Sequence, residues 1–144
     1  LPIRAQVADV YQQSINLQAS YVDALSNLIA IGRGADRQTE LNEEQQILDN
    51  LQTKAQNNRT FMEAMIAQSD NIDNITPSTA VTVEDYTNLG NAVNTQFIGD
   101  FADAGQELSL AQGELQTIQT KVNSELSGIL SQLPASYQAT TTAQ

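Results

Sequence analysis

The sequence contains no cysteine, no histidine and no tryptophan in 144 residues. Without cysteine there is no disulfide framework, no thiolate nucleophile and no zinc or iron–sulfur site of the usual kind. Without histidine the chain lacks the commonest general base at neutral pH and the commonest transition-metal ligand. These absences remove many familiar catalytic and metal-binding classes.

Basic residues are also scarce. The chain has 6 Lys and Arg against 17 Asp and Glu, which gives a net charge of −11. Such a charge argues against binding to nucleic acid or to an anionic membrane surface. No basic residue lies between Arg59 and Lys121, an interval that holds most of the excess acid. The plain interpretation is a solvated acidic face, and the alternative is a docking face for a cationic partner or divalent ions.

Long apolar runs are absent, since the longest covers only residues 28–31, far short of the roughly 18 residues of a membrane span. The chain begins with Leu1 instead of Met, so we expect a processed or excised chain. It is rich in Gln (18) and Asn (12) and poor in Lys. This composition favours an extracytoplasmic location, meaning secreted, periplasmic or on the cell surface.

Apolar residues recur with helical spacing in three long segments, at about 3–32, 36–71 and 101–133. The first segment has a seam at Val7, Val10, Ser14, Leu17, Tyr21, Ala24, Leu28 and Ile31. The last has a seam at Leu108, Ala111, Leu115, Ile118, Val122, Leu126, Ile129 and Leu133. The middle seam is weaker, because Glu44, Asn58 and Ser69 interrupt it. Stripes of this width are typical of core-facing helices.

Turn-forming residues separate these segments. We expect Gly32 and Gly34 to end the first helix and Asp36 to cap the second. The interval 70–77 reads as a loop before Pro77, and a shorter helix is expected from near Thr82, with a break near residues 99–100. The short link at 32–37 requires the first two helices to be antiparallel neighbours.

The sequence therefore predicts an all-α fold, an elongated up-and-down helical bundle of three long helices plus one shorter helix. A single domain is expected over residues 1–133, followed by a flexible C-terminal tail at 134–144. The coiled-coil-like seams could be satisfied within one chain or between chains.

Acidic residues are the remaining candidates for chemistry. Asp100, Asp103 and Glu107 would share a helix face and could hold a hard cation, but a solvated row is the simpler interpretation. The acids at 70–73 lack the ligand order of a calcium loop. No Gly-x-Ser-x-Gly elbow or phosphate-binding Gly-rich loop occurs. We therefore expect that the protein is not an enzyme and that it binds no cofactor.

Two other features could carry function. Asn58 and Asn74 begin Asn-x-Thr glycosylation sequons. A soft and aromatic group could form a pocket for a small apolar ligand between helices, or could simply be core. Its members are Phe61, Met62, Met65, Ile66, Tyr86, Phe97, Ile98 and Phe101.

From these features we expect a non-catalytic extracytoplasmic structural or protein-interaction module that acts through helix faces. Its partner would be another protein, or a second copy of the chain through self-association. The alternative is a helical ligand-binding or sensor domain that holds a small or apolar molecule between helices.

Overall fold

A computed structural model describes residues 2–73, 87, 91 and 99–135. Its elements are helix α1 (Pro2–Ala30), the short 3-10 helix η1 (Ala35–Arg37), helix α2 (Gln38–Asp73) and helix α4 (Gly99–Leu130). No strand occurs in this described part of the chain. The all-α class predicted from the periodicity is confirmed.

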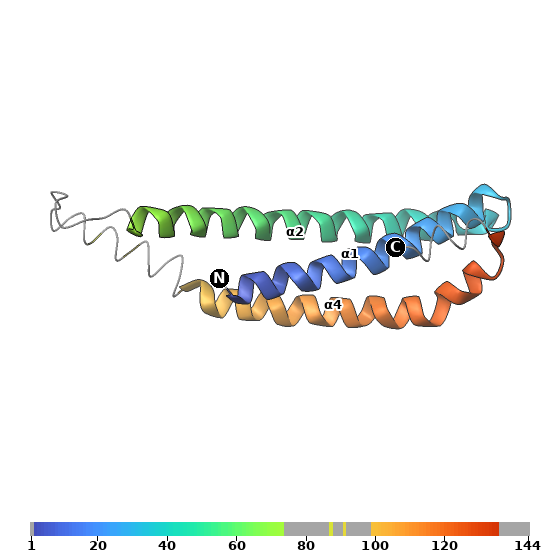
Figure 1. Cartoon of the computed structure of the whole chain (residues 1–144). Coiled ribbons are helices and arrows are strands. Elements are labelled where there is room, and N and C mark those ends of the chain that lie inside the picture. Colours follow the sequence, from blue (N-terminus) through green and yellow to red (C-terminus); the bar gives the residue numbers. More distant parts are fainter. Residues whose placement is uncertain (1, 74–86, 88–90, 92–98, 136–144) are drawn as a thin grey trace.

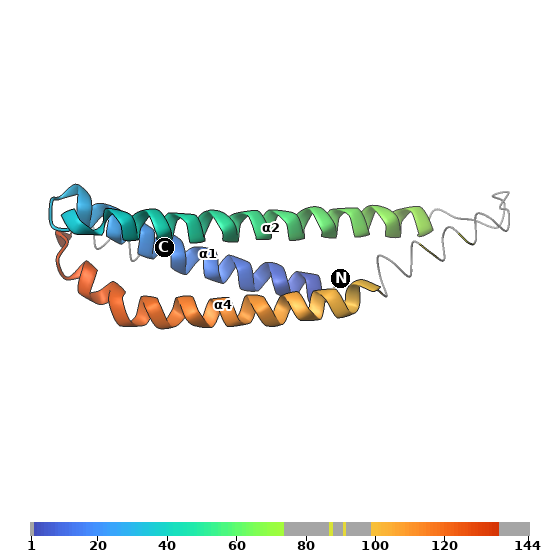
Figure 2. The ribbon, with the colours of Figure 1, turned by 180° about the vertical axis from the view of Figure 1, so that it is seen from behind.

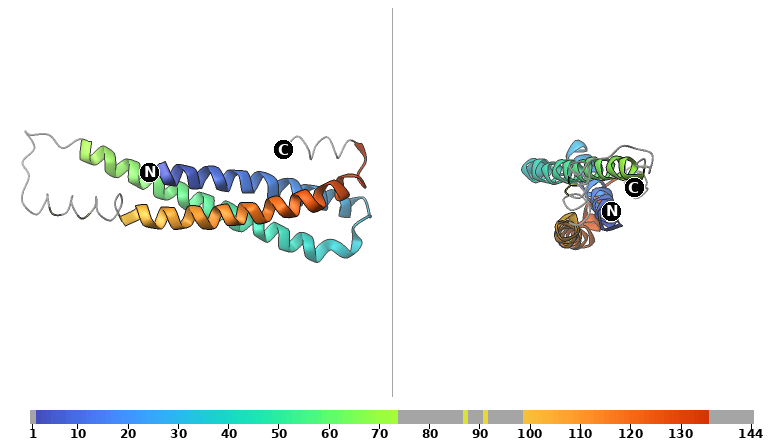
Figure 3. Two further views of the ribbon diagram at one scale, coloured as in Figure 1. Left: turned by 90° about the horizontal axis from the view of Figure 1, so that it is seen from below. Right: turned by 90° about the vertical axis from the view of Figure 1, so that its left-hand side faces the viewer.

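Helix α1 packs against both α2 and α4, as Figures 1 and 2 show from opposite sides. Arg4 of α1 contacts Asp100 near the start of α4, and Tyr21 contacts Glu125 near its end. Helices α1 and α4 therefore run in the same direction. The turn at 31–37 reverses the chain, so α2 runs antiparallel to both (Figure 3).

The turn after α1 depends on two glycines. Gly32 has a φ of 80°, a left-handed conformation that glycine adopts at little cost. Arg33 then donates its backbone N–H to the Leu28 carbonyl at 3.0 Å, which closes the helix end. At Gly34 a Cβ would lie 3.0 Å from Cγ1 of Ile29. The first glycine supplies the conformation and the second supplies the space.

Several expected boundaries differ from the structure. Asp36 lies inside η1 and does not cap α2, which begins at Gln38. Helix α2 continues to Asp73, so the expected loop is wrong for residues 70–73. Asn and Asp are only mildly unfavourable within a helix, and Pro77, the nearest strong breaker, comes later. Helix α4 begins at Gly99, slightly earlier than expected.

Other expectations fall outside the described residues. The shorter helix predicted from near Thr82 lies almost entirely outside them, as does the expected tail from residue 136 onward. The predicted count of three long helices plus one shorter helix is therefore not established.

The seams of α1 and α4 face the interior, as their periodicity predicts. Tyr21, Leu25 and Leu28 are at most 1% exposed, and Ile118 and Ile129 are at most 3% exposed. Burying each large aliphatic side chain contributes about 1.5–3 kcal/mol. Among the described helices, none combines the length and hydropathy that crossing a membrane requires.

Candidate functional site

A buried arginine joins the three helices near the start of α1. Arg4 is 7% exposed. Its Nε donates to both carboxylate oxygens of Asp100, at 3.2 and 3.0 Å, and its second terminal nitrogen donates to Oδ1 at 2.5 Å. The other terminal nitrogen donates to Glu107 and to Oδ1 of Asn58, the latter at 3.2 Å. We call these four residues the Arg4 cluster.

Neighbouring side chains complete the cluster. Asn58 Nδ2 donates to the Arg4 backbone carbonyl at 3.1 Å, and the Tyr11 hydroxyl donates to Glu107 at 2.7 Å. The Phe61 ring lies under the guanidinium, 4.6 Å from its centroid, a favourable cation–π distance. Burial, followed by the Glu107 hydrogen bond, raises the pKa of Tyr11. The phenol is therefore a donor at neutral pH.

A second polar layer lies about four helical turns beyond Arg4 along α1. Gln18 is fully buried and donates to Glu44, at 2.6 Å to the carboxylate and 2.9 Å to the backbone carbonyl. Lys121 donates to Gln18 Oε1 at 2.6 Å and also to Glu44. Its ammonium sits 5.0 Å from the Tyr21 ring centroid. This layer also links all three helices.

Tyr21 is the last polar group of this series. Its hydroxyl lies 2.7 Å from a Glu40 oxygen and 2.6 Å from a Glu125 oxygen. A phenol has one proton, so it donates to one carboxylate at a time. Burial raises the pKa of Tyr21, with the two carboxylates adding to the effect. Arg37 donates two hydrogen bonds to Glu40 and thereby lowers the pKa of that carboxyl.

These interior groups hold one another and leave little capacity for a ligand. Asp100 and Glu107 both contact Arg4, whereas Asp103 is exposed, so the three acids weighed as an alternative cation site do not converge. Within the described ranges, no group of three or more acids is arranged to hold a metal ion. The polar interior is suited to positioning helices.

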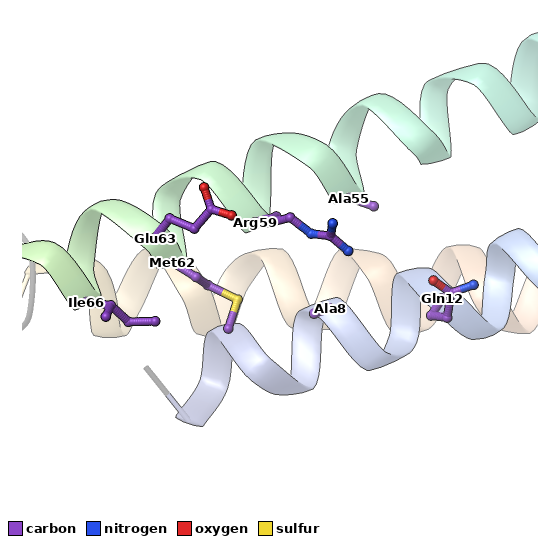
Figure 4. Close-up of a pocket in the computed structure, with 7 residues that line it drawn as sticks. All are labelled: Ala8, Gln12, Ala55, Arg59, Met62, Glu63 and Ile66. Carbon is purple, nitrogen blue, oxygen red and sulfur yellow. The ribbon is translucent and has the colours of Figure 1, made fainter.

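An open concave surface lies between α1 and α2 (Figure 4). A hollow of about 420 Å³ adjoins a second one of about 250 Å³, and both touch Gln12, Ala55 and Arg59. We call the two hollows together the α1–α2 groove. Its lining residues are Ala8, Gln12, Ile15, Gln52, Ala55, Gln56, Arg59, Met62, Glu63 and Ile66.

Arg59 is the distinctive charge of this groove. Four of the six cationic side chains, those of Arg4, Arg37, Lys54 and Lys121, pair with acids. Arg33 donates to the Gln132 carbonyl. Arg59 is exposed and has no hydrogen-bond or ion-pair partner among the described residues. Figure 4 shows its side chain extending along the groove.

The expected apolar pocket is divided. Met62 and Ile66 line the groove, whereas Met65 is buried in the interior and Phe61 packs under Arg4. The side chain of Phe101 lies outside the described part, as do Tyr86, Phe97 and Ile98.

Sequence reasoning missed the groove residues Ala8, Gln12, Ala55 and Arg59, which are unremarkable in a polar helical sequence. The Asn58 sequon is also reinterpreted, because that amide is 2% exposed and bonded to Arg4. Asn74 lies outside the described residues.

Comparisons of the chain with protein-family models, with curated proteins and with solved structures find no match.

Proposed function

We propose that this chain is a non-catalytic protein-interaction module that binds an amphipathic helix in the α1–α2 groove. The observation that carries the proposal is the shape of the groove, which follows two antiparallel helices. It extends along α2 from Gln52 to Ile66, which is about 21 Å of helix. Recognition of a helix in a groove uses an elongated surface with apolar contacts, which this groove offers at its Met62 and Ile66 end.

The chemistry of the groove supports a helical partner. Met62 and the 47% exposed Ile66 offer apolar surface at one end, and a methionine adapts its shape to different partners. Ala8 and Ala55 are small, so a partner backbone can approach closely. Arg59 and Glu63 supply charges beside this apolar strip, where they would fix the register of the partner.

The openness of the groove favours a macromolecule over a small ligand. Gln12, Arg59, Glu63 and Ile66 are all exposed. Small-molecule sites usually bury about 70–90% of their ligand. This surface would leave much of a small apolar molecule in water. The alternative of a ligand-binding or sensor domain is therefore less well supported.

The scaffold in this proposal is an elongated helical bundle whose polar interior keeps the groove walls in place. Asn58 and Phe61 contact Arg4 from inside, and the neighbouring residues Arg59 and Met62 face the groove. The contacts that hold the interior side of α2 in place therefore also hold the side that lines the groove. The extracytoplasmic location remains part of the proposal and is supported by composition.

Binding of designed helical peptides tests the proposed function. One labelled 18-residue peptide would be amphipathic, with leucines on one face and an aspartate beside them, and the other would be its scrambled form. We expect fluorescence anisotropy to show binding of the amphipathic peptide alone. Ile66→Asp should weaken binding at least about tenfold, while Leu110→Asp, outside the groove, should not. Equal binding of both peptides, or of wild type and Ile66→Asp, would refute the proposal.

A further inference from the structure

The accessible flank of α4 carries an unusual arrangement of charge. All but one of the charged side chains of α4 contact α1 or α2. They are Asp100, Glu107, Glu114, Lys121 and Glu125. Asp103 is the exception, being exposed and without a partner among the described residues. Leu110, two turns further along the helix, is 70% exposed. One free acid and one free leucine therefore share a face of α4.

The groove carries the matching pair. Arg59 has neither a hydrogen-bond nor an ion-pair partner among the described residues, and Ile66 lies two turns further along α2. Both pairs are seven residues apart, which is about 10 Å along a helix. Ile66 and Leu110 are the exposed large hydrophobic residues in the described part of the chain. The spacing aligns charge with charge and apolar side chain with apolar side chain.

We propose that α4 of a second copy of this chain occupies the α1–α2 groove, an inference that rests on the proposed function. Asp103 of one copy pairs with Arg59 of the other, and Leu110 packs against Met62 and Ile66. In this register the docked helix runs parallel to α2. Its Gln106 then lies near Glu63, where an amide can donate to the carboxylate.

The charge of the chain favours this occupant. Two copies with a net charge of −11 each repel one another over most of their surfaces. The α4 face that meets the groove has a single free acid, Asp103, and the groove offers Arg59 to it, with Glu63 one turn further along α2. The groove is built by α1 and α2 alone, so the two contacting surfaces are different patches. A contact between different patches is heterologous and can repeat from copy to copy.

Complementation between two variants tests this arrangement. Ile66→Asp blocks the groove and leaves α4 intact, whereas Leu110→Asp blocks α4 and leaves the groove intact. In sedimentation velocity at up to about 1 mM, where weak complexes are populated, wild type should associate and each variant alone should remain monomeric. The mixed variants should form a one-to-one complex that grows no further. Gln112→Asp, on another exposed face of α4, should associate like wild type.

A charge exchange provides the second test. Arg59→Asp should abolish association, and the double variant Arg59→Asp/Asp103→Arg should restore it. Circular dichroism would establish that each variant is folded. A wild type that stays monomeric over this range, or variants that fail to complement, would overturn self-docking. If the groove still bound the designed peptide, the interaction function would stand with a different partner.

Discussion

Arg4 of α1 and Asp100 of α4 form a bidentate ion pair, although they are 96 residues apart in the sequence. Both side chains are at most 8% exposed. Removing two charges from water costs several kcal/mol for each ion, which the geometry must offset. Nε and a terminal nitrogen of the guanidinium both reach the carboxylate, and Asn58 of α2 contacts the same arginine. The pair therefore fixes the relative position of all three helices.

Replacing Arg4 by leucine should be strongly destabilising. Arg4→Leu leaves Asp100 buried without its cation, a change that usually costs about 3–5 kcal/mol. Arg37→Leu is the matched control, because the Arg37–Glu40 pair is about one-third exposed and such pairs contribute about 0–1 kcal/mol. Urea unfolding followed by circular dichroism measures both. Equal losses for the two variants would mean that Arg4 is not buried in solution.

An aspartate scan across one turn of α4 tests which face lies inside. Ile118 is 3% exposed, while Gln116 is exposed. Ile118→Asp buries an unpaired charge and should cost several kcal/mol. Gln116→Asp should change the free energy of unfolding by no more than about 0.5 kcal/mol. Similar melting temperatures for the two variants would contradict the packing of α4.

Much of the helical core could be predicted from the sequence, because helical periodicity is a local property. Val7, Val10 and Leu28 on α1, and Ile118 and Val122 on α4, are buried as their spacing predicts. The all-α class follows from the same pattern. The helix ends do not follow from periodicity, because the Asp and Asn residues near Asp73 are compatible with either a turn or a last helical turn.

The polar interior could not be derived from periodicity, because its partners are distant in sequence. Nothing local indicates that Arg4 faces Asp100 or that Lys121 faces Gln18. One signal was present: Glu44 and Asn58 break the apolar seam of α2, and Asn58 proves to contact Arg4. A polar residue at a seam position indicates a buried partner on another helix.

The buried tyrosines should make the protein sensitive to alkali. Burial raises the pKa of Tyr11 and of Tyr21 above the usual value of 10. A raised pKa means that the folded state keeps a proton that the unfolded state releases. Their contribution to stability is therefore complete below pH 10 and decreases as the pH rises above it, by up to about 1.4 kcal/mol per pH unit for each tyrosine.

Melting temperatures between pH 9 and pH 12 measure this effect, with Tyr11→Phe and Tyr21→Phe as comparisons. Each variant should lose stability less steeply with pH than wild type, because it lacks one of the titrating phenols. All other side chains are common to the three proteins, so their contributions cancel in the comparison. Parallel curves for wild type and both variants would show that the phenols ionise freely in the folded state.

Ser14 should be better replaced by alanine. Its hydroxyl is buried at a seam position of α1 and has no hydrogen-bond partner among the described residues. An unsatisfied buried hydroxyl costs about 1–3 kcal/mol, and alanine also has the higher helix propensity. We therefore expect Ser14→Ala to raise the free energy of unfolding by about 1 kcal/mol or more.

Ser20→Ala is the control, because the Ser20 hydroxyl donates to the Asn16 carbonyl at 3.0 Å. The propensity gain is the same at both sites, so the difference between the variants in thermal unfolding isolates the unpaired hydroxyl. A loss of stability in Ser14→Ala would mean that the hydroxyl is bonded in solution, as it would be to a buried water molecule.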